Sequence, residues 1–330
     1  MPATVLSQPE VSVIVPTYRR FEPVLQTVSA LLGQDYPRFE VLVADQNRQW
    51  PDTLEERVAA LRRDRRVRWM NLDQPGVVRA RNQAVEAARG EILLFVDDDV
   101  FVPSRQLIAA HARHFQDQAV VAVIGRERQL TDAAIPDAPL PPLDGAPVLP
   151  PPASLTPLQQ ALWFDRNGTA PQHVCTFSTC NGSLRRTAFL GVGGFDEGFR
   201  GNSYGDDYDL ALRLHRNGGV MIYDPDAWLI HRRVPLGGLR LSDAGNTASG
   251  TDTIEGFWRF IFRHGHAGMY AYLVRTHVLR KTVLLRRNLM RPWRQPMIML
   301  QTARACWRAW RRAGAPPQSR FTTPSAMESR

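Results

Sequence analysis

Residues 90–103, GEILLFVDDDVFVP, join an apolar run directly to three consecutive carboxylates. Residues 92–96 have the length and composition of a strand buried on both faces, and Gly90 bounds it upstream. The adjacent side chains of Asp97, Asp98 and Asp99 repel one another and are costly to desolvate, so a buried cluster needs a cation or hydrogen-bond donors. A solvated turn that caps a helix near residue 104 explains the same three acids equally well. The segment alone leaves both interpretations open.

The chain upstream of this segment alternates apolar runs with helical patterns. This alternation indicates βαβ units, right-handed crossovers and a mainly parallel sheet. Ligands of such sheets gather beyond the carboxyl ends of the strands, so Thr17, Asp45 and the Asp97–Asp99 cluster are expected along one rim. Strands are predicted at residues 11–16, 39–44 and 67–72, and helices at 24–32, 54–63 and 77–89.

Downstream, a helix is predicted near residues 104–115 and a strand at 119–125. Prolines are then so dense from about 130 to 157 that a long irregular loop is expected. Order resumes at residues 174–180, and a short helix is predicted at 187–190. The segment that begins at Gly205, GDDYDLALRL, predicts a helix with Asp206, Asp207 and Asp209 at its N-terminus, where acidic residues also suit the helix dipole. Strands at 220–223 and 227–230 close the pattern, and His231 follows them.

Composition narrows the class of protein. The 330 residues are 44% hydrophobic, which is ample for one large domain or a domain with an appendage. The net charge of +9 comes almost wholly from arginine, since Lys281 is the only lysine, and it favours nucleotide phosphates, lipid headgroups or nucleic acid as partners. Cys175, Cys180 and Cys306 lack the spacing of a zinc site or a disulfide framework. With no signal peptide and no bilayer-spanning apolar run in the sequence, a cytoplasmic protein is expected.

These pieces together resemble the family 2 glycosyltransferases, which adopt the GT-A fold. The resemblance runs from about residue 11 to His231 and is carried by five segments in the family's order. It implies an α/β, Rossmann-like GT-A domain over residues 1–240, with a mainly parallel sheet flanked by helices. The composition of residues 241–330 separately predicts a basic helical extension with a disordered tail. The segments are VSVIVPTYRR, the strand ending in Asp45, GVVRARNQAVEAARGEILLFVDDDV, the NGSLRR and GGFDE pair, and GDDYDLALRL.

The resemblance also implies a chemistry: a nucleoside-diphosphate-sugar donor, a divalent cation (Mn²⁺ or Mg²⁺) and one displacement that inverts the anomeric carbon. Oxygen ligands suit such cations, and a carboxylate opposite the leaving group can take the acceptor's proton. For His231 a hydrogen-bonded strand-end histidine is an equal alternative to a metal or phosphate contact. Carried over by position, the residues are Pro16, Thr17 and Asp45 at the nucleoside, Arg81 near the nucleotide or its phosphates, Asp97 at the ribose or metal, Asp98 beside the nucleotide or only shaping the turn, Asp99 and His231 at the metal, and Asp207 as general base.

One departure bears on the reaction. The chain has no QxxRW segment after the Gly205 helix, whereas processive polysaccharide synthases of this family carry one. Transfer of one sugar, or few, to a glycan or lipid-linked acceptor is therefore expected. A UDP-sugar donor is favoured, with GDP- and dTDP-sugars as alternatives, and a role in cell-envelope glycan synthesis follows.

Two other classes of protein compete with this interpretation. A nucleotidyltransferase acting on a sugar phosphate would place a glycine-rich basic loop after the first strand, where this chain has Thr17-Tyr18-Arg19-Arg20. A non-catalytic nucleotide-sugar-binding or membrane-associated protein would not require the complete acidic set.

Beyond residue 253 the composition becomes aromatic and basic, and helices are predicted up to breaks at Pro292 and Pro296. From residue 299 the spacing predicts a helix that lies on an anionic membrane, so the protein would be peripheral on the inner face of the cell membrane, or one that packs on the catalytic domain. Nucleic acid is not expected because no recognition module accompanies the charge. The apolar stripe is Met299, Leu300, Ala303, Cys306, Trp307 and Trp310, and the basic positions are Arg304, Arg308, Arg311 and Arg312.

Overall fold

The computed structural model describes residues 8–129, 156–201, 203–232, 234, 237–238, 247–265, 293, 295–315, 317–318 and 320–321. The strands in these residues are β1 (Val11–Thr17), β2 (Phe39–Asp45), β3 (Val67–Asn71), β4 (Ile92–Val96), β5 (Val100–Phe101), β6 (Val120–Gln129), β7 (Gln172–His173), β8 (Asn181–Arg185) and β9 (Val220–His231). The helices are α1 (Phe21–Leu32), α2 (Glu55–Arg62), α3 (Val77–Ala87), α4 (Leu107–Ala112), α5 (Pro157–Trp163), α6 (Arg186–Gly191), α7 (Asp206–Arg216), α8 (Thr247–His264) and α11 (Gln295–Ala313), with 3₁₀ turns η1 (Asp52–Leu54) and η2 (Arg113–Gln116).

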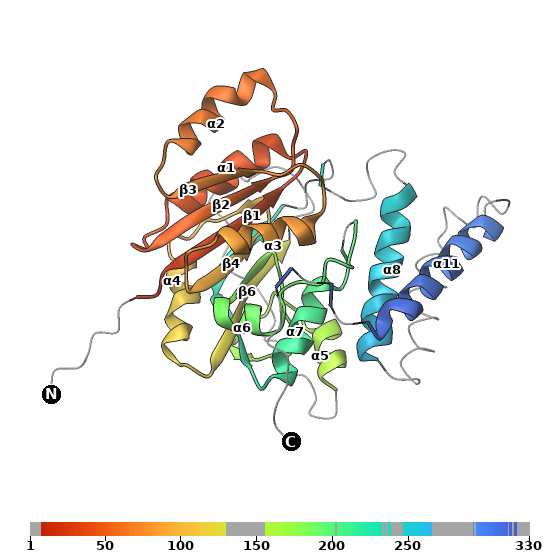
Figure 1. Cartoon of the computed structure of the whole chain (residues 1–330). Helices are drawn as coiled ribbons and strands as arrows, with labels where there is room; N and C mark the ends of the chain where they lie inside the picture. Colours follow the sequence, from red (N-terminus) through yellow and green to blue (C-terminus); the bar gives the residue numbers. More distant parts are fainter. Residues whose placement is uncertain are drawn as a thin grey trace.

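The strands form one sheet in the order β3-β2-β1-β4-β8-β6-β9-β5, and β7 pairs with β9 (Figure 1). Its N-terminal half, β3-β2-β1-β4, is parallel, as the alternating pattern predicts. Beyond β4 the sheet is mixed, because β8 runs antiparallel to both β4 and β6 while β6 and β9 are parallel. The predicted α/β class is confirmed, and the two short strands expected at 220–223 and 227–230 are one continuous strand, β9.

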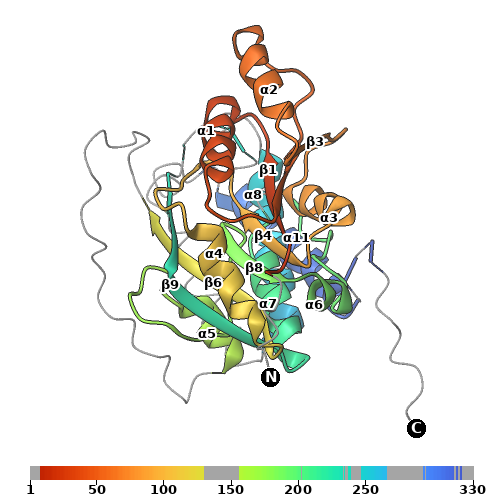
Figure 2. The ribbon, with the colours of Figure 1, turned by 90° about the vertical axis from the view of Figure 1, so that its left-hand side faces the viewer.

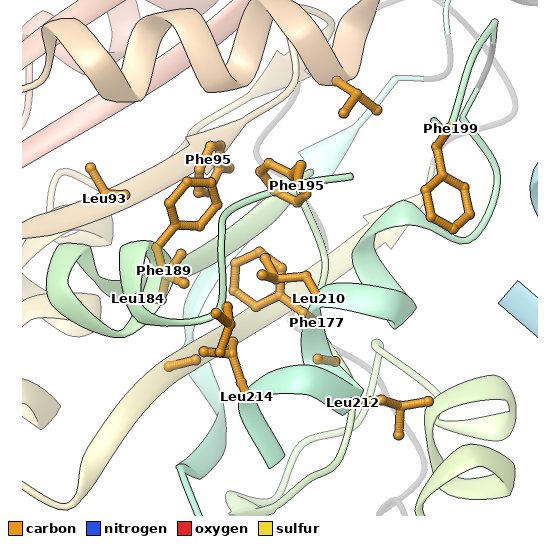
Figure 3. Packing of buried hydrophobic residues seen from close by; sticks show 14 of the residues in the cluster. Leu93, Phe95, Phe177, Leu184, Phe189, Phe195, Phe199, Leu210, Leu212 and Leu214 are labelled. Atoms are coloured by element: carbon orange, nitrogen blue, oxygen red, sulfur yellow. The ribbon is translucent and has the colours of Figure 1, made fainter. Parts of the chain in front are cut away.

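Alternating side chains of the strands fill two cores, one on each face of the sheet. Val13, Val41 and Leu94 point to the face that α1 and α4 cover, while Ile14, Leu42 and Phe95 point to the face of α3, α6 and α7. On the second face the ring of Phe95 lies 6.2 Å from Phe177, 6.1 Å from Phe189 and 5.2 Å from Phe195 (Figure 3). The strand that carries the three acids is therefore held rigidly from both sides.

Gly125 lies where β6 passes very close to its neighbours. A Cβ at this position would lie 2.1 Å from the carbonyl oxygen of Ala227 and 2.2 Å from Nδ2 of Asn181. Gly125→Ala is therefore expected to destabilise the fold by about 1–3 kcal/mol or more, since both neighbours are buried and cannot move freely. Urea denaturation checks this. Gly191→Ala is the matched control, because a Cβ there meets nothing within 4 Å, and equal midpoints for the two variants would contradict the prediction.

The C-terminal helices lie side by side, and α8 also packs against α7 (Figures 1 and 2). Helix α11 begins before Pro296 rather than after it, because a proline in the first turn of a helix displaces no intrahelical hydrogen bond. After α11, the backbone N–H of Gln318 donates to Asp196 at 2.9 Å, and the Phe321 ring lies 5.6 Å from Phe189. These described tail residues therefore contact the sheet-bearing part of the chain.

Other sequence predictions fall partly outside the described residues. Residues 130–155 of the proline-rich stretch and the helices expected within 266–292 are not among them. The stretch ends at α5, where Pro157 occupies the first turn and the Thr156 hydroxyl accepts from the Gln159 N–H at 3.3 Å. Within the parts of the chain that the structure describes, every helix is too short or too polar to cross a bilayer.

Candidate active site

A cavity of about 260 Å³ opens at the carboxyl edge of the parallel strands. It brings together residues from β1, α3, the turn after β4, and the N-terminus of α7. Five of the residues predicted from the sequence line it: Pro16, Arg81, Asp97, Asp98 and Asp207. The remaining lining residues are Tyr18, Arg20, Gln46, Val77, Arg166, Thr179, Ser203, Tyr204, Gly205, Asp206, Tyr208 and Gly238.

Asp98 is buried and joins the ends of β1 and β4. It accepts hydrogen bonds from the Thr17 hydroxyl at 2.7 Å and from Nη1 of Arg20 at 2.8 Å. Burial raises the pKa of Asp98 to about 6, against the opposing charge of Arg20. Thr17 itself does not line the cavity among the described residues, so its side chain acts by orienting Asp98. Asp98 therefore does more than shape a turn, because it fixes a buried arginine at the cavity wall.

Asp97, Asp99 and His231 form a cluster at the cavity wall, where Asp97 lines the cavity and the other two residues do not. Nε2 of His231 lies 3.8 Å from Asp97 Oδ2 and 3.3 Å from Asp99 Oδ1. Asp99 also lies 3.0 Å from Arg20 and accepts from the Val234 N–H at 3.0 Å. Although burial favours the neutral imidazole, Asp99 and Asp97 raise the pKa of His231 above its ordinary value. Carboxylate oxygens and an imidazole nitrogen are ligand types that fit Mn²⁺ or Mg²⁺, and here Asp97 and His231 lie close enough to share one ion, whereas the Asp99 carboxylate contacts Arg20, His231 and the Val234 N–H.

Cys180 belongs to the same cluster by distance. Its sulfur, a carboxylate oxygen of Asp97 and a ring nitrogen of His231 all lie within 4.8 Å of one another. Burial raises the pKa of the Cys180 thiol well above its usual value, and the nearby carboxylates add to that effect. Because only the thiolate is a good ligand, and hard cations prefer oxygen, the carboxylate of Asp97 suits a divalent cation better than the Cys180 thiol does.

Helix α7 starts at the cavity with two adjacent carboxylates. Gly205 precedes them with a φ of 101°, a backbone conformation that favours glycine, and the positive end of the helix dipole faces the acids. Asp206 accepts from Arg81 at 3.1 Å, and Arg81 also lies 3.5 Å from Asp97, so one guanidinium links α7 to the β4 turn. Burial and the charge of Asp207 raise the pKa of Asp206 to about 7.

Asp207 faces the cavity beside a second arginine. Nη2 of Arg166 lies 3.8 Å from Asp207 Oδ2, and the same guanidinium donates to the Tyr208 hydroxyl at 3.2 Å. Burial raises the pKa of Asp207, while Arg166 and Arg81 oppose the rise by stabilising the carboxylate. A partly desolvated carboxylate held by a neighbouring cation can accept a proton from a bound hydroxyl.

Arg166 is held in turn by two buried residues, Glu127 of β6 and Ser178 of the segment before β8. It lies 3.6 Å from Glu127 and donates to the Ser178 hydroxyl at 3.2 Å, and Ser178 donates to Glu127. Its backbone carbonyl accepts from the Glu127 N–H at 2.9 Å. The position and orientation of the guanidinium beside Asp207 are thus set by several independent contacts.

Asp45 lies outside this cavity. Its carboxylate is fully buried and accepts from the indole N–H groups of Trp50 at 2.6 Å and Trp69 at 2.9 Å. The other oxygen accepts from the backbone and side chain of Asn47 at 2.9 and 2.7 Å. The structure therefore places Asp45 as the anchor of the loop after β2, next to Gln46, which does line the cavity.

Sequence reasoning missed two arginines of the site. Arg20 is the last residue of the TYRR segment, and its position just after a predicted strand could have marked it as a residue of the site. Arg166 follows the proline-rich stretch and α5, where no motif marks it. Its role depends on contacts with Glu127, Ser178 and Asp207. These residues are not its neighbours in the sequence, so the contacts form only when the chain folds.

The sequence model described as "Glycosyl transferase family 2" matches residues 12–189, more than half of the chain. The chain belongs to glycosyl transferase family 2. The match includes β1, β4 and the three acids, and ends within α6, just before the GGFDE segment. The family resemblance and the GT-A fold predicted from the sequence are confirmed.

Family members with curated names are similar over about two thirds of the chain. The O-antigen biosynthesis protein RfbC of Myxococcus xanthus is 32% identical over 234 residues, 68% of this chain and 17% of that protein. Validoxylamine A glucosyltransferase of Streptomyces hygroscopicus subsp. jinggangensis is 28% identical over 246 residues, 69% of this chain and 56% of that protein. The chain thus matches between about a sixth and just over half of the length of these two relatives.

Solved structures share the fold at low sequence identity. The mannosyltransferase PcManGT from Pyrobaculum calidifontis, solved with GDP-Man and Mn²⁺, superposes with a TM-score of 0.53 at 20% identity, covering 91% of this chain and 76% of that one. Residues 1–349 of TarS from S. aureus superpose with a TM-score of 0.56 at 17% identity, covering 91% and 80%.

Proposed function

We propose that this chain transfers a sugar from a nucleoside-diphosphate-sugar to an acceptor hydroxyl, with inversion and with Asp207 as general base. The observation that carries the proposal is that Asp97, Asp98, Arg81 and Asp207 all line one cavity. The acids after β4 suit the cation-bound diphosphate of a donor, and Asp207, at the N-terminus of α7, would receive the proton of the acceptor. Family membership and the named relatives support the same reaction class.

In this proposal each residue of the site has a separate role. Pro16 and Gln46 line the β1–β2 side of the cavity and would contact the nucleoside, while Arg81 lies where it can contact the phosphates. Asp97, Asp99 and His231 would hold a divalent cation. When bound, that cation offsets the charge developing on the departing nucleoside diphosphate. Asp207 removes the proton of the acceptor hydroxyl as the hydroxyl attacks the anomeric carbon and the bond to the diphosphate breaks.

We propose the donor and the acceptor by their chemical class. A UDP-sugar is the favoured donor, with GDP- or dTDP-sugars as alternatives, and a glycan or lipid-linked molecule is the acceptor. Transfer is non-processive, since no QxxRW segment follows α7. A cytoplasmic place in cell-envelope glycan synthesis fits the similarity to the O-antigen biosynthesis protein.

Calorimetry with a panel of nucleoside diphosphates tests the donor site. One diphosphate is expected to bind more tightly with Mn²⁺ than without it, and Asp99→Asn is expected to remove most of that difference, because it removes a negative charge from the cluster. Asp226→Asn, an exposed carboxylate outside the cavity, is the control and should bind like the parent. A panel without any metal-dependent binding would overturn the proposed donor site.

Arg166→Gln is expected to move the acid limb of the pH–rate profile to higher pH. Arg166 opposes the rise that burial produces in the pKa of Asp207, so its removal lets that pKa rise further. A general base works only when deprotonated, and activity would then be lost at a higher pH as the medium is acidified. Arg166→Lys keeps the charge and should shift the limb less. The same acid limb in all three proteins would show that Arg166 does not tune the base.

A further inference from the structure

Exposed large hydrophobic side chains are concentrated in one part of the molecule. Among the described residues, Tyr204 lines the candidate active site, and all the others lie between positions 293 and 310. The surfaces of soluble proteins carry isolated apolar residues, but a cluster of large apolar side chains marks a surface that a membrane or another molecule covers. The members are Trp293, Met297, Met299, Leu300, Trp307 and Trp310.

All of these side chains except Trp293 belong to helix α11, which leaves them exposed to solvent. Its buried positions, Thr302, Ala305 and Ala309, lie on one side, and the helix packs against α8. The opposite side carries Trp307 and Trp310, which are 55% and 64% exposed. At 100° per residue, Met299 and Leu300 share this side, so α11 has two apolar faces, one packed and one open. Figure 1 shows α8 and α11 at one side of the molecule, with α11 the outer of the two.

The open face is bordered by positive charge. Arg304 and Arg311 are exposed beside it, and the guanidinium of Arg311 lies 4.9 Å from the ring centre of Trp307. Arg308 and Arg312 instead pair with Glu255 of α8 at 2.7 and 3.1 Å. Helix α11 contains no acidic residue, so the charged side chains that it places beside its open face are all basic.

We propose that the open face of α11 docks on a bilayer surface that contains anionic lipids. Trp and Met side chains enter the boundary between headgroups and acyl chains, and Arg304 and Arg311 contact the lipid phosphates. A second copy of the chain fits less well, because a two-fold contact through this face would bring the same arginines together. Docking would act independently of the sugar-transfer chemistry and would hold the chain beside membrane-bound molecules.

Co-sedimentation of the full chain with vesicles tests the proposal. Binding is expected to vesicles of phosphatidylglycerol and phosphatidylcholine but not to phosphatidylcholine alone, and to weaken with salt. Trp307→Ser with Trp310→Ser, and separately Arg304→Gln with Arg311→Gln, should each lower the partition coefficient about tenfold or more. Circular dichroism and thermal unfolding should be unchanged, since all four side chains are exposed.

A matched control separates docking from net charge. Arg63→Gln with Arg65→Gln removes two exposed arginines beside α2 and should reduce vesicle binding much less. Equal losses from the two arginine pairs, or unchanged binding of the tryptophan variant, would overturn the proposal. The proposal would also be overturned if the parent chain did not bind anionic vesicles and instead formed a concentration-dependent dimer in analytical ultracentrifugation, provided that the tryptophan variant did not form this dimer.

Discussion

Asp207→Asn is expected to lower the turnover number for sugar transfer by about 10²- to 10⁴-fold while leaving donor affinity nearly unchanged. The amide has the size of the carboxylate but cannot take the acceptor's proton. Donor affinity should persist because Arg81 pairs with Asp206 and Asp97, so that contact does not use the carboxylate of Asp207. Transfer rates and donor binding must therefore be measured separately, by product formation and by calorimetry.

The control for this experiment is Asp226→Asn, which neutralises an exposed carboxylate outside the cavity and should leave both quantities unchanged. A variant at Asp207 that transfers sugar at the parent rate would exclude it as the base. If donor binding were lost together with transfer, the substitution would instead have disturbed the cavity, and the rate could not be assigned to proton transfer.

Asp209→Asn is expected to destabilise the protein by about 3–5 kcal/mol, because it breaks a buried cluster of charges and leaves cations without their partner. Asp209 is fully buried and contacts Arg213 of its own helix at 2.9 Å, with Arg263 and His264 of α8 at 2.9 and 2.7 Å. Arg263 also pairs with Asp196 at 2.8 Å. The cluster thus ties α8 to α7, the helix that carries the proposed base, and to the GGFDE segment.

The loss of unfolding free energy in Asp209→Asn should be larger at neutral pH than in acid. Burial alone would raise the pKa of Asp209, but Arg213, His264 and Arg263 hold it far below its usual range. A depressed folded-state pKa stabilises the fold above the unfolded value of about 3.9, and this stability fades as the pH falls below it. Urea denaturation should therefore show a large gap between parent and variant at neutral pH that narrows in acid.

Glu22→Gln is the matched control for Asp209→Asn. Glu22 pairs with Arg57 at 2.6 Å, but both side chains are about half exposed, so the change should cost less than about 1 kcal/mol. A cost for Asp209→Asn as small as that of the control would mean that α8 contributes little to the stability of α7.

Local patterns in the sequence were sufficient for the sheet's parallel half. The apolar run at 92–96 is β4, and the runs that end near Pro16, Ala44 and Leu72 are the neighbouring strands β1, β2 and β3. Because β1, β2 and β4 are buried on both faces, their apolar runs can be recognised without knowledge of the neighbouring strands, whereas β3 at the edge of the sheet is only partly buried. The same reasoning correctly expected polar groups at one edge, where Thr17 and Asp45 are register partners.

Local patterns were insufficient where a contact joins distant segments. Pro296 indicated a helix break, yet it lies in the first turn of α11, where its missing N–H costs no intrahelical hydrogen bond. Similarly, the hydrogen-bond pattern of β8 makes the sheet mixed, and its own residues, NGSLR, do not reveal the direction of the neighbours.

The sequence by itself determined the strand 92–96, the acids at its end and the acidic start of α7, since apolar runs and helix termini are encoded within a few residues. The tertiary structure decided what surrounds those acids. Arg81 meets Asp206 from 125 positions away, and Arg166 meets Asp207 from 41 away along a chain interrupted by other elements. Ion pairs between residues so far apart in the sequence depend on how the helices and strands pack. The same packing buries each carboxylate to a different extent, and this burial shifts its pKa and limits its access to solvent.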